Sequence, residues 1–191
     1  MTANNPSRAM WSQPMTRKGS RFAVAFIVAG LTVLIDQVSK AAALAQLSET
    51  ERIPLLGDVI GLQLAFNPGA ILSFGSEATW LLTLLGVGAI GVLFVAAMHS
   101  RTAGWAIGIG FILGGAIGNV LDRLLAPPGF GRGHVTDFLA YGNMFIGNLA
   151  DVALAIGALI LCFGLWIRRR EGLQRSNAVT AQTENAQADL P

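Results

Sequence analysis

Four long apolar runs constrain the fold of this chain more than any other feature of its sequence. A helix needs about 20 mostly apolar residues to cross the hydrocarbon core of a bilayer. Such runs cover residues 22–47, 79–98, 102–121 and 145–167, and the second and third carry no charged side chain. Only 13% of the residues are charged, whereas a soluble domain carries about 25%. We therefore predict an all-α membrane protein with four transmembrane helices.

Basic residues are concentrated before the first run, between the second and third, and after the fourth. Lys and Arg beside transmembrane helices favour the cytoplasmic side of the membrane. We therefore expect both termini in the cytoplasm and residues 48–78 and 124–144 on the opposite, periplasmic face of the membrane. The residues that carry this prediction are Arg8, Arg17, Lys18, Arg21, Arg101, Arg168, Arg169, Arg170 and Arg175.

The chain divides into a membrane domain and two polar tails. We assign residues 22–170 to the membrane domain and residues 1–21 to a cytoplasmic N-terminal tail. Residues 171–191 form a cytoplasmic C-terminal tail that we expect to be disordered, because it is poor in large apolar residues. Residues 56–66 alternate in places between apolar and polar side chains, which predicts a small periplasmic β-like platform between the first and second helices.

The composition excludes several other classes of protein. Cys162 is the one cysteine of the sequence, so no disulfide framework is expected. Two histidines and one cysteine are too few for a convincing zinc site, and we predict neither a metal nor another cofactor. The net charge of +2 is too small to indicate nucleic-acid binding.

Polar residues gather near the predicted periplasmic ends of the helices, and spacings of three or four residues place several on shared helical faces. Ionisable groups inside a membrane are costly and usually face the bundle interior in partnered sets. The group comprises Asp36, Lys40, Asn119, Asp122, Arg123, Asp137, Asn148 and Asp151. For Asp36, Lys40, Asp122 or Arg123 taken singly, an anchor at a helix end or a structural ion pair is an equally good interpretation.

Asp137 and Asp151 suit a hydrolytic pair of carboxylates. Asp151 lies in an apolar run without a nearby cation in sequence, and Asp137 lies just before that run. Two close carboxylates cannot both ionise readily, so they share a proton. One then acts as general base on a water molecule while the other polarises the scissile carbonyl. The sequence leaves open which residue takes which role, and such a coupled pair should lose activity at low pH.

Five short motifs occur in order along the chain. They are DQVSK at 36–40, FNPGAILSF at 66–74, GGAIGNVLDR at 114–123, GHVTDF at 133–138 and NLAD at 148–151. Each is weak alone, but together with four apolar runs they resemble the lipoprotein signal peptidases, also called signal peptidase II.

The resemblance implies an intramembrane aspartyl endopeptidase with Asp137 and Asp151 as its catalytic pair. It implies substrates that are diacylglyceryl-modified prolipoproteins, cut just before the lipidated cysteine to free the signal peptide. It also implies contact with membrane lipid, no metal, and inhibition by globomycin-type cyclic peptides; we expect a monomer. Substrate-binding or supporting roles would fall to Asp36, Lys40, Asn67, Gly69, Gly115, Asn119, Asp122, Arg123, Asn148 and Ala150.

The sequence departs from the family pattern at several positions. Gly147 stands where Phe is usual, and Phe145 is expected to take over its packing. Residues 124–132 form an extra loop, and the stretch between the two aspartates is short. Ile71 and Leu72 replace a common Ala-Phe pair. We expect these changes to affect substrate fit or gating rather than the chemistry.

Two other classes of function compete with the peptidase. In a proton-coupled transporter Asp151 would carry protons, but such proteins commonly show internal repeats or a polar path across the membrane, and the inner halves of the four runs are apolar. In a non-catalytic assembly factor, replacing Asp137 and Asp151 would leave function intact.

Overall fold

Four long helices form the bundle that the apolar runs predict. The computed structural model describes residues 17–69 and 78–188. In this part of the chain α1 spans Arg17–Gln46, α2 Thr79–Met98, α3 Ala103–Leu125 and α4 Leu149–Ala188. Each contains a stretch of 20 to 28 residues that is long and apolar enough to cross a membrane. The prediction of four spanning helices is confirmed.

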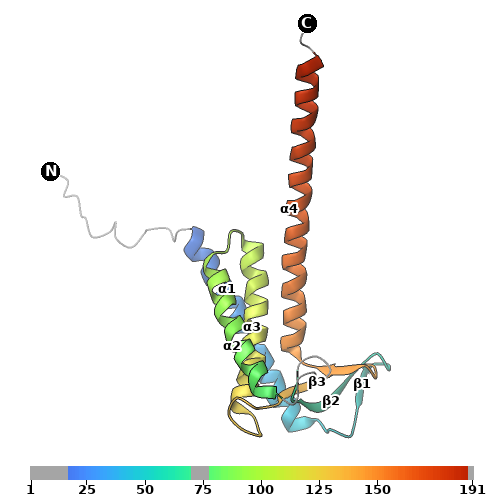
Figure 1. Ribbon diagram of the computed structural model, residues 1–191. Helices are drawn as coiled ribbons and strands as arrows, with labels where there is room; N and C mark the ends of the chain where they lie inside the picture. Colours follow the sequence, from blue (N-terminus) through green and yellow to red (C-terminus); the bar gives the residue numbers. More distant parts are fainter. Residues whose placement is uncertain (1–16, 70–77, 189–191) are drawn as a thin grey trace, which may run out of the picture.

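Helix α3 packs against the other three helices (Figure 1). Half of its most apolar window is buried, against 11% for α2, so α2 is largely left to face lipid. Small residues bring the backbones of α3 and α1 together: a Cβ added at Gly110 or Gly114 would lie 2.7 Å from the carbonyl oxygen of Ala25 or Ala29, respectively. Close approach at small residues is typical of helix packing in membranes.

A four-stranded antiparallel sheet lies at one end of the bundle, which we call the sheet end (Figure 1). Its order is β1 (Ile53–Leu56), β2 (Ile60–Asn67), β3 (Val135–Tyr141) and β4 (Phe145–Gly147). The predicted platform between the first two helices is therefore confirmed as β1 and β2. The hairpin of β3 and β4, which comes from the segment between α3 and α4, completes the sheet and was not foreseen.

The fourth helix begins later and ends later than predicted. We expected helix from residue 145, but Phe145–Gly147 is strand β4 and α4 starts at Leu149. The side chain of Asn148 accepts a hydrogen bond from Asp151 N (3.0 Å), and Asp151 Oδ2 accepts one from Asn148 N (3.2 Å). Such reciprocal bonds form a capping box, which fixes a helix start.

At its other end α4 runs on through residues 171–188 (Figure 1). We expected disorder in this segment, but Ala, Gln and Glu recur along it and are good helix formers. Residues 1–16 of the N-terminal tail and residues 189–191 lie outside the described residues, as do Ile71 and Leu72.

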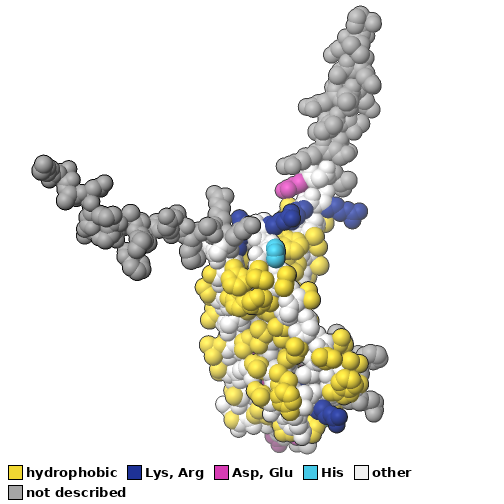
Figure 2. Space-filling view, turned by 60° about the vertical axis from the view of Figure 1, so that its left-hand side comes forward, with side chains coloured by type: hydrophobic (Ala, Val, Ile, Leu, Met, Phe, Trp, Pro, Cys, Tyr) yellow, Lys and Arg dark blue, Asp and Glu magenta, His cyan; other side chains and the backbone are white. Residues whose placement is uncertain are grey.

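The surface of the bundle has the two zones expected of a membrane protein. Apolar side chains cover the flank of the helices, and Lys and Arg side chains gather at the end opposite the sheet (Figure 2). Exposed apolar residues of the flank include Leu31, Leu84, Val92 and Leu159. The basic group includes the exposed Arg168, Arg169 and Arg170, which follow the apolar part of α4.

Candidate active site

A cavity of about 520 Å³ opens at the sheet end of the bundle, between the sheet and α2, α3 and α4. Its lining is mostly apolar, with Leu82, Val120 and Leu154 among the residues around it. Both candidate catalytic residues, Asp137 and Asp151, line this cavity. The structure thus brings together two carboxylates that come from a strand and a helix.

Asp137 lies on β3 and is almost completely buried, with 2% of its surface exposed. Its Oδ2 accepts a hydrogen bond from Asn67 Nδ2 at 3.1 Å, and its Oδ1 accepts one from Asn148 Nδ2 at 2.6 Å. The pKa of Asp137 is raised to about 6, chiefly by burial and next by the charge of Asp151. The two amide hydrogen bonds and the charge of Lys40 act in the opposite direction.

Asp151 lies in the first turn of α4, and its side chain is exposed. One carboxylate oxygen accepts a hydrogen bond from the side chain of Asn119 at 3.0 Å, and the other is held by the capping box. Asn148 therefore binds both aspartates, Asp137 through its side-chain amide and Asp151 through its backbone N–H. Because one residue holds both carboxylates, their relative placement is fixed by the start of α4.

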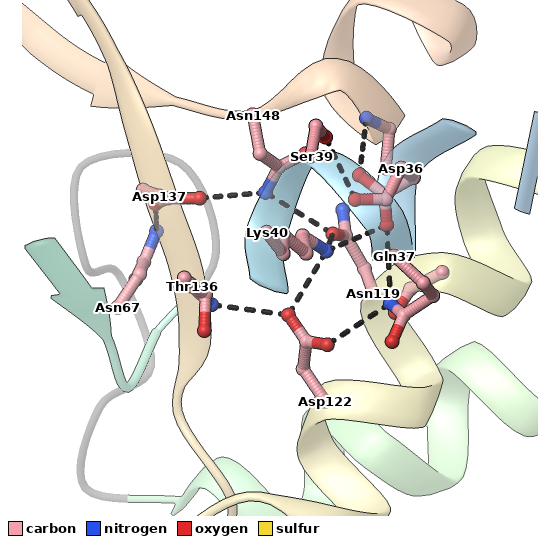
Figure 3. A network of polar contacts seen from close by, with 12 residues as sticks. Asp36, Gln37, Ser39, Lys40, Asn67, Asn119, Asp122, Thr136, Asp137 and Asn148 are labelled. Atoms are coloured by element: carbon pink, nitrogen blue, oxygen red, sulfur yellow. Dashed lines mark hydrogen bonds and ion pairs between the residues drawn. The ribbon is translucent and has the colours of Figure 1, made fainter. Parts of the chain in front are cut away.

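A buried ion-pair cluster is linked through Asn119 to Asn148, which binds both aspartates (Figure 3). Lys40 Nζ lies 2.8 Å from Asp36 Oδ2 and 2.9 Å from Asp122 Oδ2, and it donates to Asn119 Oδ1 at 3.1 Å. Breaking a buried ion pair by removing one partner costs about 3–5 kcal/mol, because a charge is left uncompensated. The cluster joins α1 to α3. It also contacts Asn119, the residue whose side chain binds Asp151.

The two acidic members of this cluster also hold the polypeptide that carries the catalytic candidates. Asp36 Oδ1 accepts a hydrogen bond from Ala150 N at 2.9 Å, one residue before Asp151. Asp122 Oδ2 accepts one from Thr136 N at 3.0 Å, one residue before Asp137. Each candidate aspartate thus has its neighbouring backbone N–H tied to one carboxylate of the cluster.

Arg123 holds a different element. Its guanidinium donates to the carbonyl oxygens of Pro68 and Gly69, just after β2, and Asn67 Oδ1 accepts a hydrogen bond from Gly69 N at 3.0 Å. Its neighbour Asp122 pairs with Lys40, so Asp122 and Arg123 brace separate parts of the site.

Two glycines of α3 leave room for the site. A Cβ at Gly115 would lie 2.6 Å from Ala150 O, and a Cβ at Gly118 would collide with the carboxylate of Asp36. Gly115 was among the predicted supporting residues. On the opposite side Phe145 stacks on Tyr141, with ring centroids 4.8 Å apart, and lines the cavity. At Gly147 a Cβ would lie 3.0 Å from Asp151 Oδ2.

The structure gathers all the predicted site residues at the sheet end and adds one that the analysis of single motifs missed. Gln37 Nε2 lies within hydrogen-bond distance of Asp36 Oδ2 (3.2 Å), Asp122 Oδ1 (3.1 Å) and Gly118 O (3.2 Å). It therefore links α1 to α3 beside Lys40 (Figure 3). Its place within the DQVSK motif was the available signal.

Two aspartate carboxylates brought together in one cavity are the arrangement that aspartic peptidases use. Residues 16–167 match the family model described as signal peptidase (SPase) II. The chain is 41% identical to the lipoprotein signal peptidase of Leifsonia xyli subsp. xyli, over 97% of this chain and 90% of the relative. It is 38% identical to that of Rhodococcus jostii strain RHA1, over 83% and 79% of the two chains.

These matches show that the chain belongs to the signal peptidase II family of aspartic peptidases. Its fold is also similar to that of a bacterial membrane enzyme solved by the in meso method at 1.9 Å resolution. The TM-score is 0.65 at 21% identity, over 75% of this chain and 92% of that one. At this level of identity the structural match supports the fold alone. Together with the relatives from bacteria, it shows a multi-pass bacterial membrane protein.

Proposed function

We propose that this protein removes signal peptides from diacylglyceryl-modified prolipoproteins, with Asp137 and Asp151 as its catalytic pair. The observation that carries the proposal is that both carboxylates line one cavity and are held together by Asn148. One carboxylate takes a proton from water as the water oxygen attacks the scissile carbonyl carbon, and the other gives its proton to the carbonyl oxygen. The resulting tetrahedral diol breaks at its C–N bond when the first carboxyl group gives its proton to the leaving nitrogen and the second takes one from a diol hydroxyl.

The position of the cavity supports a substrate that is anchored in the membrane. The cavity lies where the ends of α3 and α4 meet the sheet, and its lining is mostly apolar. A signal helix and acyl chains in the lipid would hold the peptide bond before the lipidated cysteine near this depth. Such positioning converts a bimolecular encounter into an effectively intramolecular one.

The proposed orientation places the sheet end at the periplasmic face of the inner membrane and both termini in the cytoplasm. Its support is the group of arginines at the opposite end of the bundle (Figure 2), because positive charge favours the cytoplasmic side. We also propose that the protein acts as a monomer and that a globomycin-type peptide inhibits it by occupying the cavity.

Cleavage of a purified diacylglyceryl-modified prolipoprotein in detergent tests the function directly. We expect a cut immediately before the lipidated cysteine, located by mass spectrometry, because the acyl chains fix the depth of the scissile bond. The matched control is the same prolipoprotein without the lipid, which we expect to be cut far more slowly. Equal cleavage of both forms, or a cut at another bond, would contradict the proposed substrate.

The pH profile of kcat/KM is expected to be bell-shaped, because a pair that shares one proton works only between its two ionisation steps. The raised pKa of Asp137, about 6, places the upper step near that pH. Activity of the free enzyme should therefore decline as pH rises through about 6, when both carboxylates ionise, and again at low pH, when both are protonated. Initial rates at low substrate concentration measure this profile, and a flat response from pH 4 to 8 would refute a coupled pair.

A further inference from the structure

We infer that the two aspartates have fixed, unequal roles: Asp151 is the ionised general base, Asp137 carries the proton, and Lys40 is a positioning residue that maintains this state through Asn119. The inference rests on the proposed function, because it assumes that these two residues are the catalytic pair. It is carried by differences in exposure, backbone setting and hydrogen bonding between the two sites.

The surroundings of Asp151 favour a carboxylate. The side chain of Asp151 is exposed and lines the cavity, whereas that of Asp137 is buried. Asp151 lies in the first turn of α4 and closes the capping box with Asn148. Negative charge is stabilised at a helix N-terminus by the helix dipole and by free backbone N–H groups. The carboxylate that is exposed in the cavity is also the one that an attacking water can approach.

The orientation of Asn119 adds a second bias. An asparagine side chain presents an accepting oxygen on one side and a donating NH2 group on the other. Lys40 Nζ and Asn148 Nδ2 both donate to Asn119 Oδ1, at 3.1 Å and 3.2 Å, so this oxygen faces the cluster. Asn119 Nδ2 must then point the other way, to Asp151 at 3.0 Å. Lys40 thus holds a donor against Asp151 and brings a positive charge near it.

Lys40 is itself fixed in place. Asp36 and Asp122 bind its ammonium group from α1 and α3 (Figure 3), and both carboxylates are in turn held by backbone N–H groups, of Ala150 and Thr136 respectively. A flip of the Asn119 amide would place its NH2 group against the ammonium. The arrangement therefore stabilises one of the two amide orientations.

The surroundings of Asp137 favour the protonated form. The charged groups that act on it are Asp151 from α4, Lys40 from α1 and Arg123 from α3. Burial and the charge of Asp151 outweigh the two amide hydrogen bonds and the charge of Lys40, and they raise the pKa of Asp137 to about 6. Since Asn67 and Asn148 each donate to a different oxygen of Asp137, its proton is directed away from these amides.

The assignment fixes the course of the protons. Asp151 accepts a proton from water as the new C–O bond forms, and Asp137 donates its proton to the carbonyl oxygen, which gives a neutral diol. Asp137 then takes a proton back from a diol hydroxyl while Asp151 gives its proton to the leaving nitrogen and the C–N bond breaks. Both residues return to their starting states, and the net reaction consumes one water.

Infrared titration of the full-length protein labelled with 13C-aspartate tests the assignment without substrate. We expect wild type to show a carboxylic acid signal that disappears near pH 6. Asp137→Asn should lack this signal, and Asp151→Asn should keep it with a lower midpoint, because the neighbouring charge is removed. Loss of the signal in Asp151→Asn but not in Asp137→Asn would reverse the roles, and the absence of any such signal in wild type would also overturn the inference. Because no cleavage is measured, these outcomes are independent of the substrate proposal.

The role of Lys40 is tested by kinetics in Lys40→Met and Lys40→Arg. In Lys40→Met we expect kcat to fall about 100-fold through misplacement of a catalytic group, with little change in KM. The acid limb of the pH–rate profile should move up by about one unit, because a nearby positive charge is lost. Lys40→Arg should restore the acid limb, since it keeps the charge.

Two further variants keep this test decisive. Lys40→Met/Asp36→Asn leaves the net charge of the buried cluster unchanged, so it serves if the single variant fails to fold. A smaller upward shift is expected, because the negative charge of Asp36, which opposes that of Lys40 at Asp151, is removed as well. Ser39→Ala is the matched control on the same helix, because Ser39 Oγ donates only to Asp36 O in the contacts of the described residues. An unmoved acid limb in folded protein without Lys40, or a shift of equal size in Ser39→Ala, would show that Lys40 is merely structural.

Discussion

Asp137→Asn and Asp151→Asn are each expected to reduce kcat by on the order of 10⁴-fold, the largest effect that a single substitution should have in this protein. An amide cannot accept the proton of the attacking water or deliver one to the carbonyl oxygen. In Asp137→Asn an NH2 group would also face one of the two amide donors, from Asn67 and Asn148, that now bind the carboxylate. Single-turnover cleavage of a lipidated prolipoprotein measures the chemical step.

The control for these variants is Asp58→Asn. Asp58 is an exposed residue of the turn between β1 and β2, and it does not line the cavity. We expect this variant to cut at the rate of wild type. If either cavity variant, recovered from membranes in normal amount, retained more than a few per cent of wild-type kcat, the catalytic assignment would be wrong, and an assembly role for the carboxylates would become the better explanation.

The helices and the gathering of polar residues at their predicted periplasmic ends were accessible from the sequence because each rests on a local pattern. The individual site residues were assigned by the resemblance to the signal peptidase II family. Length and apolarity define the four spans, and the interval of four residues between Asp36 and Lys40 predicts their ion pair. The spacing of Asn148 and Asp151 likewise placed both near the start of the fourth helix. Local patterns of this kind are set by helix geometry alone and need no knowledge of the fold.

Only half of the sheet could be predicted from the sequence. Strands β1 and β2 show a partial alternation. Strand β3 instead ends in the short apolar run 138–141, and β4 stands at the start of the apolar run that was predicted as the fourth helix. Short apolar runs do not distinguish a buried strand from a helix segment. The pairing of β3 with β2 and β4 decides the outcome, and that pairing depends on residues far apart in the chain.

The pairing of residues within the ion-pair cluster could not be predicted from the sequence either. In the folded bundle Asp122 of α3 pairs with Lys40 of α1. The choice follows from how tightly α1 packs on α3, and this is set by glycines whose role is visible only when the two backbones are placed together. Spacing along one helix cannot report which residue of another helix will be its partner.

Gly118→Ala should therefore be unusually damaging for the addition of one methyl group. The new Cβ would collide with the Asp36 carboxylate, which is fully buried. This carboxylate cannot easily move, because Lys40 and Ala150 N hold its two oxygens. Overpacking of this kind costs about 1–3 kcal/mol, more than the roughly 0.5–1 kcal/mol that alanine gains over glycine within a helix. We expect lower stability and, because the support of Asp151 is displaced, lower kcat.

Gly91→Ala on α2 is the matched control, since a Cβ there would have no neighbouring atom within 4 Å. Its midpoint of thermal unfolding in detergent should equal or exceed that of wild type, with unchanged cleavage, whereas Gly118→Ala should unfold at lower temperature. If Gly118→Ala proved as stable and as active as Gly91→Ala, Asp36 would have room to shift without consequence. The ion-pair cluster would then not be the rigid support on which Asn119 and Asp151 depend, because a rigid support cannot absorb a methyl group at its point of closest contact.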